Sequence, residues 1–459
     1  MNIEQIYTGC LAQGAYYITS NGEAAIIDPL REIQPYLNRA EKDGVKIKYI
    51  FETHFHADFV SGHLDLAKKT GAAIIYGPNA KPEFDFISAV DGQEFKVGDL
   101  SILALHTPGH TMESTTYLLR DKHGKDYCIF SGDTLFLGDV GRPDLSQKDS
   151  NLTTEDLAGF LYDSLQKKIM PLADDVIVYP AHGAGSACGK NMMKETIDTL
   201  GNQKKVNYAL KQDSKDDFIK AVTEGLSAPP AYFSMNVSMN KKGYADFEIV
   251  LSHGMKSILV KEFGAIADSS GALILDTRSQ ANFAKGFIPQ SINIGLDGDF
   301  APWVGTLIAD VNQAILLVTE SGREEESVTR ISRVGFDQVI GHLEGGFDAW
   351  KIAGYEIDKI EKISVDAFAK SILSDEYKVI DVRRDDEYNA GHVVNANSKP
   401  LANINDWIKE INPNEHFFIH CASGYRSMIA ASILQARGYR NFTVIDGGYS
   451  AIKELTINH

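Results

Sequence analysis

The stretch Thr53-His54-Phe55-His56-Ala57-Asp58-Phe59 places two histidines and an aspartate on a few consecutive residues. It follows residues 47–51, an apolar run typical of a strand, and precedes residues 62–69, whose apolar spacing predicts a helix. A polar loop between a strand and a helix is a common place for a metal site. Phe59 stands where a two-metal version of such a loop would carry another imidazole, and its benzyl group can ligate nothing. The stretch therefore predicts a site for one metal ion.

The bulk composition bounds the class of protein. The chain has 459 residues, 44% of them hydrophobic, so two or three domains with their own cores are expected. A formal net charge of −17 argues against a nucleic acid or an anionic membrane as partner. No apolar run approaches the length of a membrane span, and the first residues lack the basic and apolar segments of a secretory signal. We therefore expect a cytoplasmic protein. Its four scattered cysteines fit free thiols in a reducing compartment: Cys10, Cys128, Cys188 and Cys421.

The second half of the chain contains an internal repeat. Residues 273–278 (LILDTR) are echoed by residues 378–383 (KVIDVR). Each copy has a glycine ten positions after its aspartate, and each ends in an acidic residue, two glycines and an aromatic residue. Copies that lie about 100 residues apart predict two domains of that size and not a solenoid. Turn-forming residues near 229–230, 240–243 and 357–361 mark the ends of the segments. We predict three domains, at residues 1–243, 244–358 and 359–459.

Other candidate ligands in the first domain share one context. Each comes just after a strand-like run: His110, Asp133 and His182. Polar residues at the ends of neighbouring strands gather at one edge of a sheet, where they form a pocket. With His54 and His56 they make a set of candidate ligands whose matching contexts are improbable for unrelated structural residues.

Taken in order, four motifs resemble those of the metallo-β-lactamase superfamily. They are Thr-His-x-His-x-Asp, Pro-Gly-His-Thr, Ser-Gly-Asp-Thr-Leu-Phe and Tyr-Pro-Ala-His-Gly, which begin at residues 53, 108, 131 and 179. Within the superfamily they look most like the branch that contains glyoxalase II and the persulfide dioxygenases. The resemblance covers roughly the first half of the chain. It implies an αββα sandwich with the metal at the edges of the sheets.

The two kinds of enzyme in this branch bind different metals. In a dizinc hydrolase of glyoxalase II type, a second ion is held by the aspartate and histidine that close the first motif and by the histidine of Tyr-Pro-Ala-His. This chain keeps Asp58 and His182 but has Phe59, so its second site has lost an imidazole. The hydrolase is the leading alternative to the enzyme described next.

The resemblance to persulfide dioxygenases implies one iron(II) per chain. Two histidines and one carboxylate leave positions open for a substrate sulfur and for O₂, whereas zinc has no redox chemistry. The implied iron ligands are the counterparts of His54, His110 and Asp133. The sequence leaves His56 open as a fourth ligand, but we expect it to support the ligands, as we expect of Asp58 and His182.

Three more residues of the first domain each have two alternative interpretations, one functional and one structural. Gly141-Arg142-Pro143-Asp144 resembles the loop whose arginine helps to hold the substrate, and a cation suits a persulfide carrier with a carboxylate or phosphate tail. The alternative for Arg142 is a surface ion pair. Tyr179 either donates a hydrogen bond to a ligand or packs in the core. Cys188 either carries sulfur between sites or is a bystander thiol.

The last domain carries a cysteine on a short loop. Residues 417–420 read as a buried strand that leads into Cys421-Ala422-Ser423-Gly424-Tyr425-Arg426, and an apolar helix follows. Converging backbone N–H groups and the positive end of the helix dipole favour a thiolate there. This loop resembles that of the rhodanese family, which implies catalytic roles for Cys421 and Arg426. Four residues between Cys and Arg suit sulfane sulfur, whereas cysteine phosphatases have five. The Asp-Val-Arg and Gly-His motifs at 381–383 and 391–392 match scaffold features of the family.

The middle domain has the same scaffold without the nucleophile. Its corresponding loop is Thr319-Glu320-Ser321-Gly322-Arg323-Glu324, and its glutamates would repel anionic sulfur. We interpret this domain as an inactive rhodanese copy kept for spacing, docking or dimerisation.

The whole architecture resembles bacterial fusions of a persulfide dioxygenase with one inactive and one active rhodanese module. The resemblance implies that O₂ oxidises low-molecular-weight thiol persulfides to sulfite, and that Cys421 forms thiosulfate, in sulfide detoxification. A non-enzymatic sulfur carrier or sensor is a further alternative. The carrier thiol is not encoded in any motif we identify, and the extra rhodanese surface favours a homo-oligomer.

Overall fold

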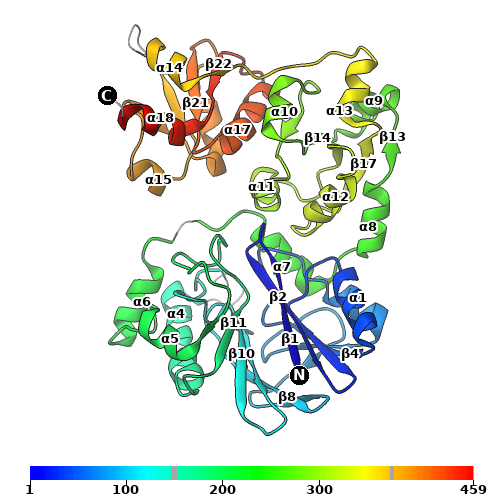
Figure 1. Cartoon of the computed structure of the whole chain (residues 1–459), viewed down its shortest axis with the longest axis vertical. Helices are drawn as coiled ribbons and strands as arrows, with labels where there is room; N and C mark the ends of the chain where they lie inside the picture. The colour runs from blue at the N-terminus through cyan, green and yellow to red at the C-terminus, as the bar shows by residue number, and fades with distance from the viewer. Residues whose placement is uncertain (146–151, 227, 373–376, 458–459) are drawn as a thin grey trace. The chain divides into compact units, whose positions relative to one another are not determined.

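The computed structural model describes residues 1–145, 152–226, 228–372 and 377–457. It divides into two compact units, of which the first is Met1–Phe247 with Ser332–Gly335 and the second is Glu248–Ile331 with Phe336–His459. Figure 1 shows the elements of both. The predicted domain limits at residues 243 and 358 stay predictions.

The first unit contains two six-stranded sheets. The first sheet runs in the order β1-β2-β3-β4-β5-β6. Its strands are β1 (Asn2–Thr8), β2 (Gln13–Ser20), β3 (Glu23–Ile27), β4 (Lys46–Phe51), β5 (Ala73–Tyr76) and β6 (Ile87–Ser88). The second sheet runs in the order β12-β11-β10-β9-β8-β7. Its strands are β7 (Glu94–Val97), β8 (Leu100–His106), β9 (Thr115–Arg120), β10 (Asp126–Gly132), β11 (Ile177–Pro180) and β12 (Asp198–Thr199).

Three apolar cores show how these sheets are layered. One core lies between the sheets and joins Phe51 of the first sheet to Phe130 of the second. A second core packs the outer face of the first sheet against Tyr36 and Leu66, and a third packs the other sheet against Leu161. The covering helices are α1 (Gln34–Asp43), α2 (His63–Thr70), α4 (Thr154–Ser164), η1 (Leu165–Ile169), α5 (Leu200–Val206) and α6 (Lys215–Thr223). The predicted αββα sandwich is confirmed. Because helices cover its outer faces, β2 and β3 are buried on both sides along almost their whole length.

The second unit contains two parallel five-stranded sheets with the same topology. The first has the order β13-β17-β16-β14-β15 and the second β18-β22-β21-β19-β20. Their strands are β13 (Ser257–Ile258), β14 (Leu273–Asp276), β15 (Ile292–Asn293), β16 (Ile315–Val318), β17 (Val339–Leu343), β18 (Lys362–Ile363), β19 (Val379–Asp381), β20 (Ala396–Ser398), β21 (Phe417–His420) and β22 (Phe442–Ile445). The predicted α/β repeat is therefore confirmed.

Helices connect these parallel strands, as parallel pairing requires. Those of the middle domain and its approach are α8 (Phe247–Gly254), α9 (Val260–Ser270), α10 (Gln280–Lys285), α11 (Phe300–Leu307), α12 (Glu324–Ser332) and α13 (Gly346–Ile352). Those of the last domain are α14 (Val365–Ser371), α15 (Asp385–Asn389), α16 (Ile404–Trp407), α17 (Tyr425–Ala436) and α18 (Gly448–Ile457).

The echoed Asp-x-Arg motif has one structural role in both copies. In the last domain, Arg383 donates to both carboxylate oxygens of Asp381 and to the carbonyl of Gly391, and its guanidinium lies 3.9 Å from the ring centre of Tyr449. The middle domain repeats these contacts with Arg278, Asp276, Gly286 and Phe347. In each copy, one buried arginine thus joins the end of a strand, a turn and the last helix of the domain.

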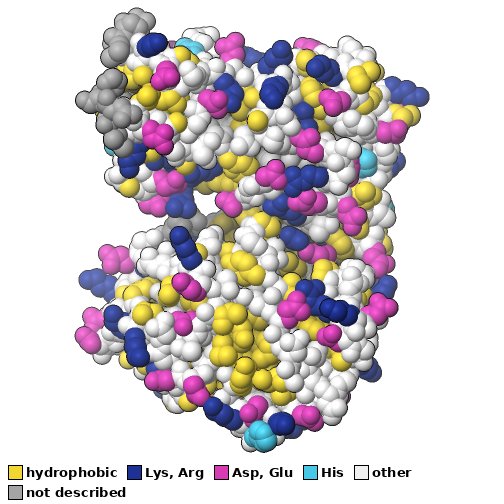
Figure 2. Space-filling model, in the orientation of Figure 1, with side chains coloured by type: hydrophobic (Ala, Val, Ile, Leu, Met, Phe, Trp, Pro, Cys, Tyr) yellow, Lys and Arg dark blue, Asp and Glu magenta, His cyan; other side chains and the backbone are white. Residues whose placement is uncertain are grey.

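The surface carries charges of both signs, and Figure 2 shows acidic and basic side chains intermixed over the face in view. Across the residues that the structure describes, we find no helix long and apolar enough to cross a membrane.

Candidate functional site

Three predicted ligands meet at one edge of the sandwich. His54 follows β4, His110 follows β8, and Asp133 follows β10, because the ends of these strands face the same edge. All three side chains are buried. The Nε2 atoms of His110 and His54 lie 3.4 and 3.8 Å from Asp133 Oδ2. One ligand atom from each residue lies within 4.8 Å of the others, so the three can hold one metal ion together.

Hydrogen bonds fix which nitrogen of each histidine faces this point. His110 Nδ1 lies 2.8 Å from the carbonyl oxygen of Arg142, which can only accept, so Nδ1 carries the proton. Thr53 Oγ1 donates to Asp28 Oδ2 at 2.9 Å and therefore accepts from His54 Nδ1 at 3.0 Å. Both Nε2 lone pairs are left for a metal, and such outer hydrogen bonds are the usual support of metal-binding histidines. Burial also lowers the pKa of His54 well below its ordinary value, which keeps its ring neutral.

The carboxylate of Asp133 shows that the site fits a cation. Its Oδ2 is buried and has no hydrogen-bond partner among the residues that the structure describes. An orphaned buried carboxylate oxygen is costly unless a cation pairs with it. The other oxygen, Oδ1, lies 2.8 Å from His182 Nδ1. The geometry therefore directs one oxygen to a metal and the other to an imidazole.

His182 is held between two acids. Its Nδ1 faces Asp133, and its Nε2 lies 2.8 Å from Asp58 Oδ2. Burial would lower the pKa of His182, but the two carboxylates outweigh burial and raise this pKa well above its ordinary value. The two carboxylates therefore favour a protonated ring beside the candidate ligand Asp133.

A second group of potential ligands lies beside the first. One ligand atom each from His56, Asp58 and His182 falls within 4.8 Å of the others. Phe59 is fully buried, and its ring centre lies 4.3 Å from that of His56. The Nε2 of His56 is turned to Asp28 Oδ1, at 3.1 Å. The structure thus brings together all the residues that were predicted to support the metal.

The residue that the sequence did not reveal is Asn240, in α7 (Phe233–Lys242). Its fully buried amide nitrogen donates to the carbonyls of His56 and Phe59, both at 2.8 Å, and its oxygen accepts from the backbone N–H of Ser61 at 2.9 Å. One side chain therefore clamps the metal-binding loop at three points. From the sequence, residues 240–243 are expected to form a turn, whereas Asn240 lies inside α7, and nothing in the sequence indicates which distant loop its amide holds.

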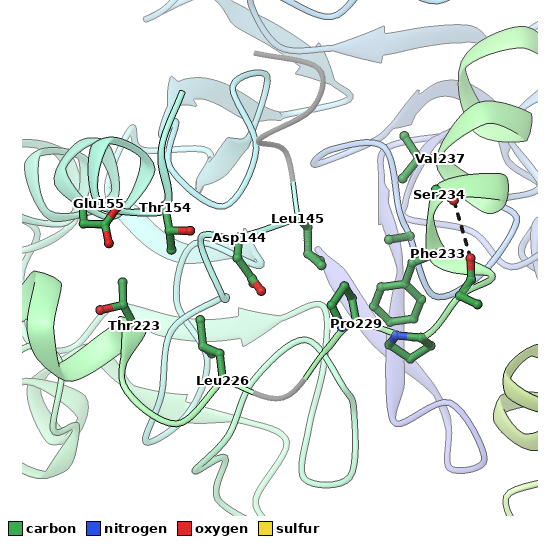
Figure 3. A pocket seen from close by; sticks show the side chains of 13 residues that line it. Asp144, Leu145, Thr154, Glu155, Thr223, Leu226, Pro229, Phe233, Ser234 and Val237 are labelled. Carbon is green, nitrogen blue, oxygen red and sulfur yellow. Dashed lines mark hydrogen bonds between the residues drawn. The ribbon is translucent and has the colours of Figure 1, made fainter. Parts of the chain in front are cut away.

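A cavity of about 740 Å³ opens beside this loop. Ala57 reaches its wall from between His56 and Asp58. Figure 3 shows Phe233, Ser234 and Val237 of α7 on one side and Thr154 and Glu155 on the other. A smaller adjoining hollow is lined by Ala57, His110, Glu113 and Lys241, among others. This hollow has a volume of about 30 Å³ and connects the cavity side of the loop with the candidate ligand His110.

The structure places Tyr179 away from the other two predicted substrate-binding residues, since the N–H of Arg142 donates to the carbonyl of Cys188 at 3.0 Å. Arg142 is buried, and it donates to both carboxylate oxygens of Asp144 at 2.7 Å. Tyr179 lies in the core between the sheets, 5.4 Å from the ring centre of Phe130. Cys188 lies beside the metal ligands, because its Sγ belongs to a group with Asp133 and His182. Burial raises the pKa of Cys188 well above its ordinary value.

The predicted cysteine loop lies at the end of β21. The backbone N–H of Gly424 donates to Cys421 Sγ at 3.1 Å, and α17 begins at the next residue. Cys421 is buried, and its carbonyl accepts from the N–H of Tyr449 at 2.7 Å. Arg426 forms a two-point pair with Glu387, at 2.6 and 2.8 Å. The loop thus offers its sulfur a backbone donor and a helix N-terminus, which is what a stabilised thiolate requires.

In the middle domain the equivalent loop is occupied by ion pairs. Arg323 donates to Asp297 at 2.8 Å and to both oxygens of Glu326. The chain has no cysteine between residues 188 and 421, so this domain has no thiol at all.

Comparisons with known proteins match the first part of the chain to one family and the second part to another. The profile of the metallo-beta-lactamase superfamily matches residues 8–182, and that of the rhodanese-like domain matches residues 259–353 and 364–455. A crystal structure of a metallo-beta-lactamase from Staphylococcus aureus is 30% identical and superposes with a TM-score of 0.68, covering 74% of this chain and 99% of that one.

Two curated relatives match the first part of the chain. The cytoplasmic hydroxyacylglutathione hydrolase of Arabidopsis thaliana is 32% identical over 178 residues, which are 38% of this chain and 65% of that protein. The hydroxyacylglutathione hydrolase GloC of Haemophilus influenzae is 29% identical over 213 residues, or 41% of this chain and 94% of that protein. The match therefore spans just under two thirds of the Arabidopsis relative.

Proposed function

Because the chain belongs to the metallo-β-lactamase superfamily and carries two rhodanese-like domains, we propose that it oxidises thiol persulfides with O₂ and transfers sulfane sulfur through Cys421. The enzyme would be a persulfide dioxygenase and thiosulfate sulfurtransferase that acts in sulfide detoxification. The carrier is a low-molecular-weight thiol, and we expect a cytoplasmic homo-oligomer.

One observation carries the proposal: the ligand set is complete for one ion. His54, His110 and Asp133 converge, while the second oxygen of Asp133 is committed to His182. A bridging carboxylate between two metals would need that oxygen. Two histidines and one carboxylate are the ligands of non-heme iron(II) oxygenases, and iron bound there would supply the activation of O₂.

The residues of the chain perform the remaining work at this site. The Asp28–Thr53 pair and the carbonyl of Arg142 hold the two histidine rings in the ligating tautomer. A persulfide in the cavity beside Ala57 would lie next to the loop that carries His56 and Asp58. His182 keeps a proton between two carboxylates at the edge of the site, so Asp133 stays ionised.

The overall oxidation balances with water as the third reactant. A persulfide RSSH with O₂ and H₂O gives RSH and H₂SO₃. The S–S bond breaks, the outer sulfur is oxidised to sulfite and the inner sulfur is reduced to the thiol. The outer sulfur loses more electrons than the inner one gains, and the difference reduces O₂. The inner sulfur leaves as the thiol and takes a proton.

Sulfur transfer at Cys421 needs no redox partner. The thiolate attacks the outer sulfur of RSSH, the S–S bond breaks, and RSH leaves. Sulfite then attacks the outer sulfur of the cysteine persulfide, so that thiosulfate leaves and the thiolate is restored. The N–H of Gly424 and the start of α17 support the negative sulfur before and after each transfer.

O₂ consumption by the iron-loaded protein on glutathione persulfide tests the proposal. We expect uptake that requires both the persulfide and iron. Uptake that is absent on glutathione, coenzyme A and bacillithiol persulfides alike would refute the dioxygenase.

A dizinc thioester hydrolase remains the competing function. It is favoured by the names of the two curated relatives and by the grouping of His56, Asp58 and His182. Such an enzyme would bind about two zinc ions per chain and hydrolyse a hydroxyacylglutathione thioester. Zinc content and thioester hydrolysis, measured on the same preparation, separate the two functions.

A further inference from the structure

The cysteine loop of the last domain is anchored in the middle domain through Tyr425. This residue stands between Gly424, which donates to Cys421 Sγ, and Arg426. Its hydroxyl donates to the carbonyl oxygen of Gly295 at 2.7 Å. The residue that begins α17 is therefore held by the neighbouring domain of the same compact unit.

A glycine of the middle domain makes room for the ring of Tyr425. A Cβ atom at Gly298 would lie 2.4, 2.6 and 2.7 Å from three of its ring carbons, closer than any real Cβ contact. The backbone at Gly298 does not adopt a positive φ, so any residue fits its conformation. Position 298 therefore needs glycine for the space that Tyr425 fills.

A second contact fixes the same face of α17. The backbone N–H of Asn293 donates to Ser432 Oγ at 2.9 Å, and Ser432 lies two helical turns after Tyr425. The side chain of Asn293 is itself tied down, since its amide donates to the carbonyls of Asp276 and Arg278, each at 2.9 Å. Asn293, which contacts α17 from the end of β15, is thus firmly held within the middle domain.

We propose that the middle rhodanese domain is a positioning element for the Cys421 loop and that Tyr425 is its positioning residue. The N–H of Gly424 reaches the sulfur only if the first turn of α17 keeps its direction. Arg426 ties that turn to Glu387 of the last domain, and the contacts of Tyr425 and Ser432 tie the helix to the middle domain. A domain without a cysteine thereby acts on the reactivity of the cysteine in the next one. The positioning of Cys421 does not depend on the proposed function. Only the use of the positioned sulfur in sulfur transfer rests on that function.

The full-length chain offers matched substitutions for a test. Gly298→Ala pushes a methyl group into the Tyr425 ring, and Tyr425→Phe removes only the hydroxyl that reaches Gly295. Gly264→Ala is the control, because this middle-domain glycine lies in α9 and its added Cβ would lie at an ordinary 3.7 Å from Trp350. The readout is the rate of Cys421 alkylation by iodoacetamide across pH, followed by mass spectrometry of the Cys421 peptide.

We expect Gly298→Ala to slow alkylation roughly tenfold near neutral pH and to displace the pH profile upward, in keeping with a thiolate that loses a helix N-terminus. Tyr425→Phe should cause a smaller change in the same direction, and Gly264→Ala should match the wild type. In a Tyr425→Ala background, Gly298→Ala should add nothing, because the two residues act through one contact.

Wild-type alkylation profiles in both Gly298→Ala and Tyr425→Phe would overturn the proposal, as would an equal loss in Gly264→Ala. If Gly298→Ala does not fold, Tyr425→Phe decides by itself. Alkylation requires neither O₂ nor sulfur transfer. A protein that shows the expected shifts but no activity on persulfides would therefore lose the proposed function and keep this inference.

Discussion

Replacing Asn240 by leucine should weaken metal binding from a position outside the set of ligands. The leucine keeps the number and branching of the side-chain heavy atoms but removes the hydrogen bonds to His56, Phe59 and Ser61, all of them buried. At about 1 kcal/mol each, and more for groups left unpaired, the loss is about 3 kcal/mol or somewhat larger. Removing outer support of this kind typically lowers metal affinity about 10- to 100-fold.

Two assays follow this change without relying on turnover. Hydrogen exchange measured by mass spectrometry should be on the order of 100-fold faster in the peptide that contains Ser61. This increase corresponds to a loss of about 3 kcal/mol in the free energy of local opening. Competition with a chelator should show the drop in iron affinity. Activity at saturating iron should fall less than activity at limiting iron.

The same helix supplies the control. Asn236 is buried one turn before Asn240, and its side chain has no hydrogen-bond partner among the residues that the structure describes. Asn236→Leu should leave exchange at Ser61 and iron affinity close to the wild type. Equal effects of the two leucines, or no effect of Asn240→Leu, would refute the reasoning that the amide clamps the loop.

Four further outcomes are expected. Asp133→Ala should abolish persulfide-dependent O₂ uptake while thiosulfate sulfurtransferase activity persists; loss of both would contradict the division between the sites. Cys421→Ser should keep O₂ uptake and shift the product from thiosulfate to sulfite, whereas an unchanged product would remove Cys421 from the cycle. Phe59→His should raise zinc binding from about one toward two ions per chain on reconstitution, and an unchanged ratio would show that Phe59 does not limit the second site. Burial lowers the pKa of His63 from 6.5 to about 3, so the unfolded chain binds the extra proton and stability falls as pH drops from 6.5 toward 3, by about 5 kcal/mol in all. His63→Phe should flatten this loss, as read from the thermal midpoint of the first unit between pH 7 and 5.

Much of the fold follows from local sequence. The runs around Ile50 and Ile129 are apolar on both faces because helices cover both sheets, and such runs can be recognised without a structure. The polar residues that follow these strands meet because strand ends share an edge, which is why His110 and Asp133 could be paired from the sequence.

Contacts between distant segments could not be predicted in the same way. Nothing in the sequence near Asn240 indicates that its amide holds the loop at His56, since the contact depends on how α7 returns across the sandwich. The partner of Arg142 is only two residues away, yet its burial beside Asp144 depends on the fold around it. The fit of Tyr425 against Gly298 likewise arises only when two domains pack together.

Metal content and O₂ uptake, measured on one preparation of the full-length protein, test the central claim most directly. With the ligands His54, His110 and Asp133, we expect about one iron per chain and O₂ consumption that depends on a persulfide. Two zinc ions per chain, thioester hydrolysis and no O₂ consumption would contradict the account.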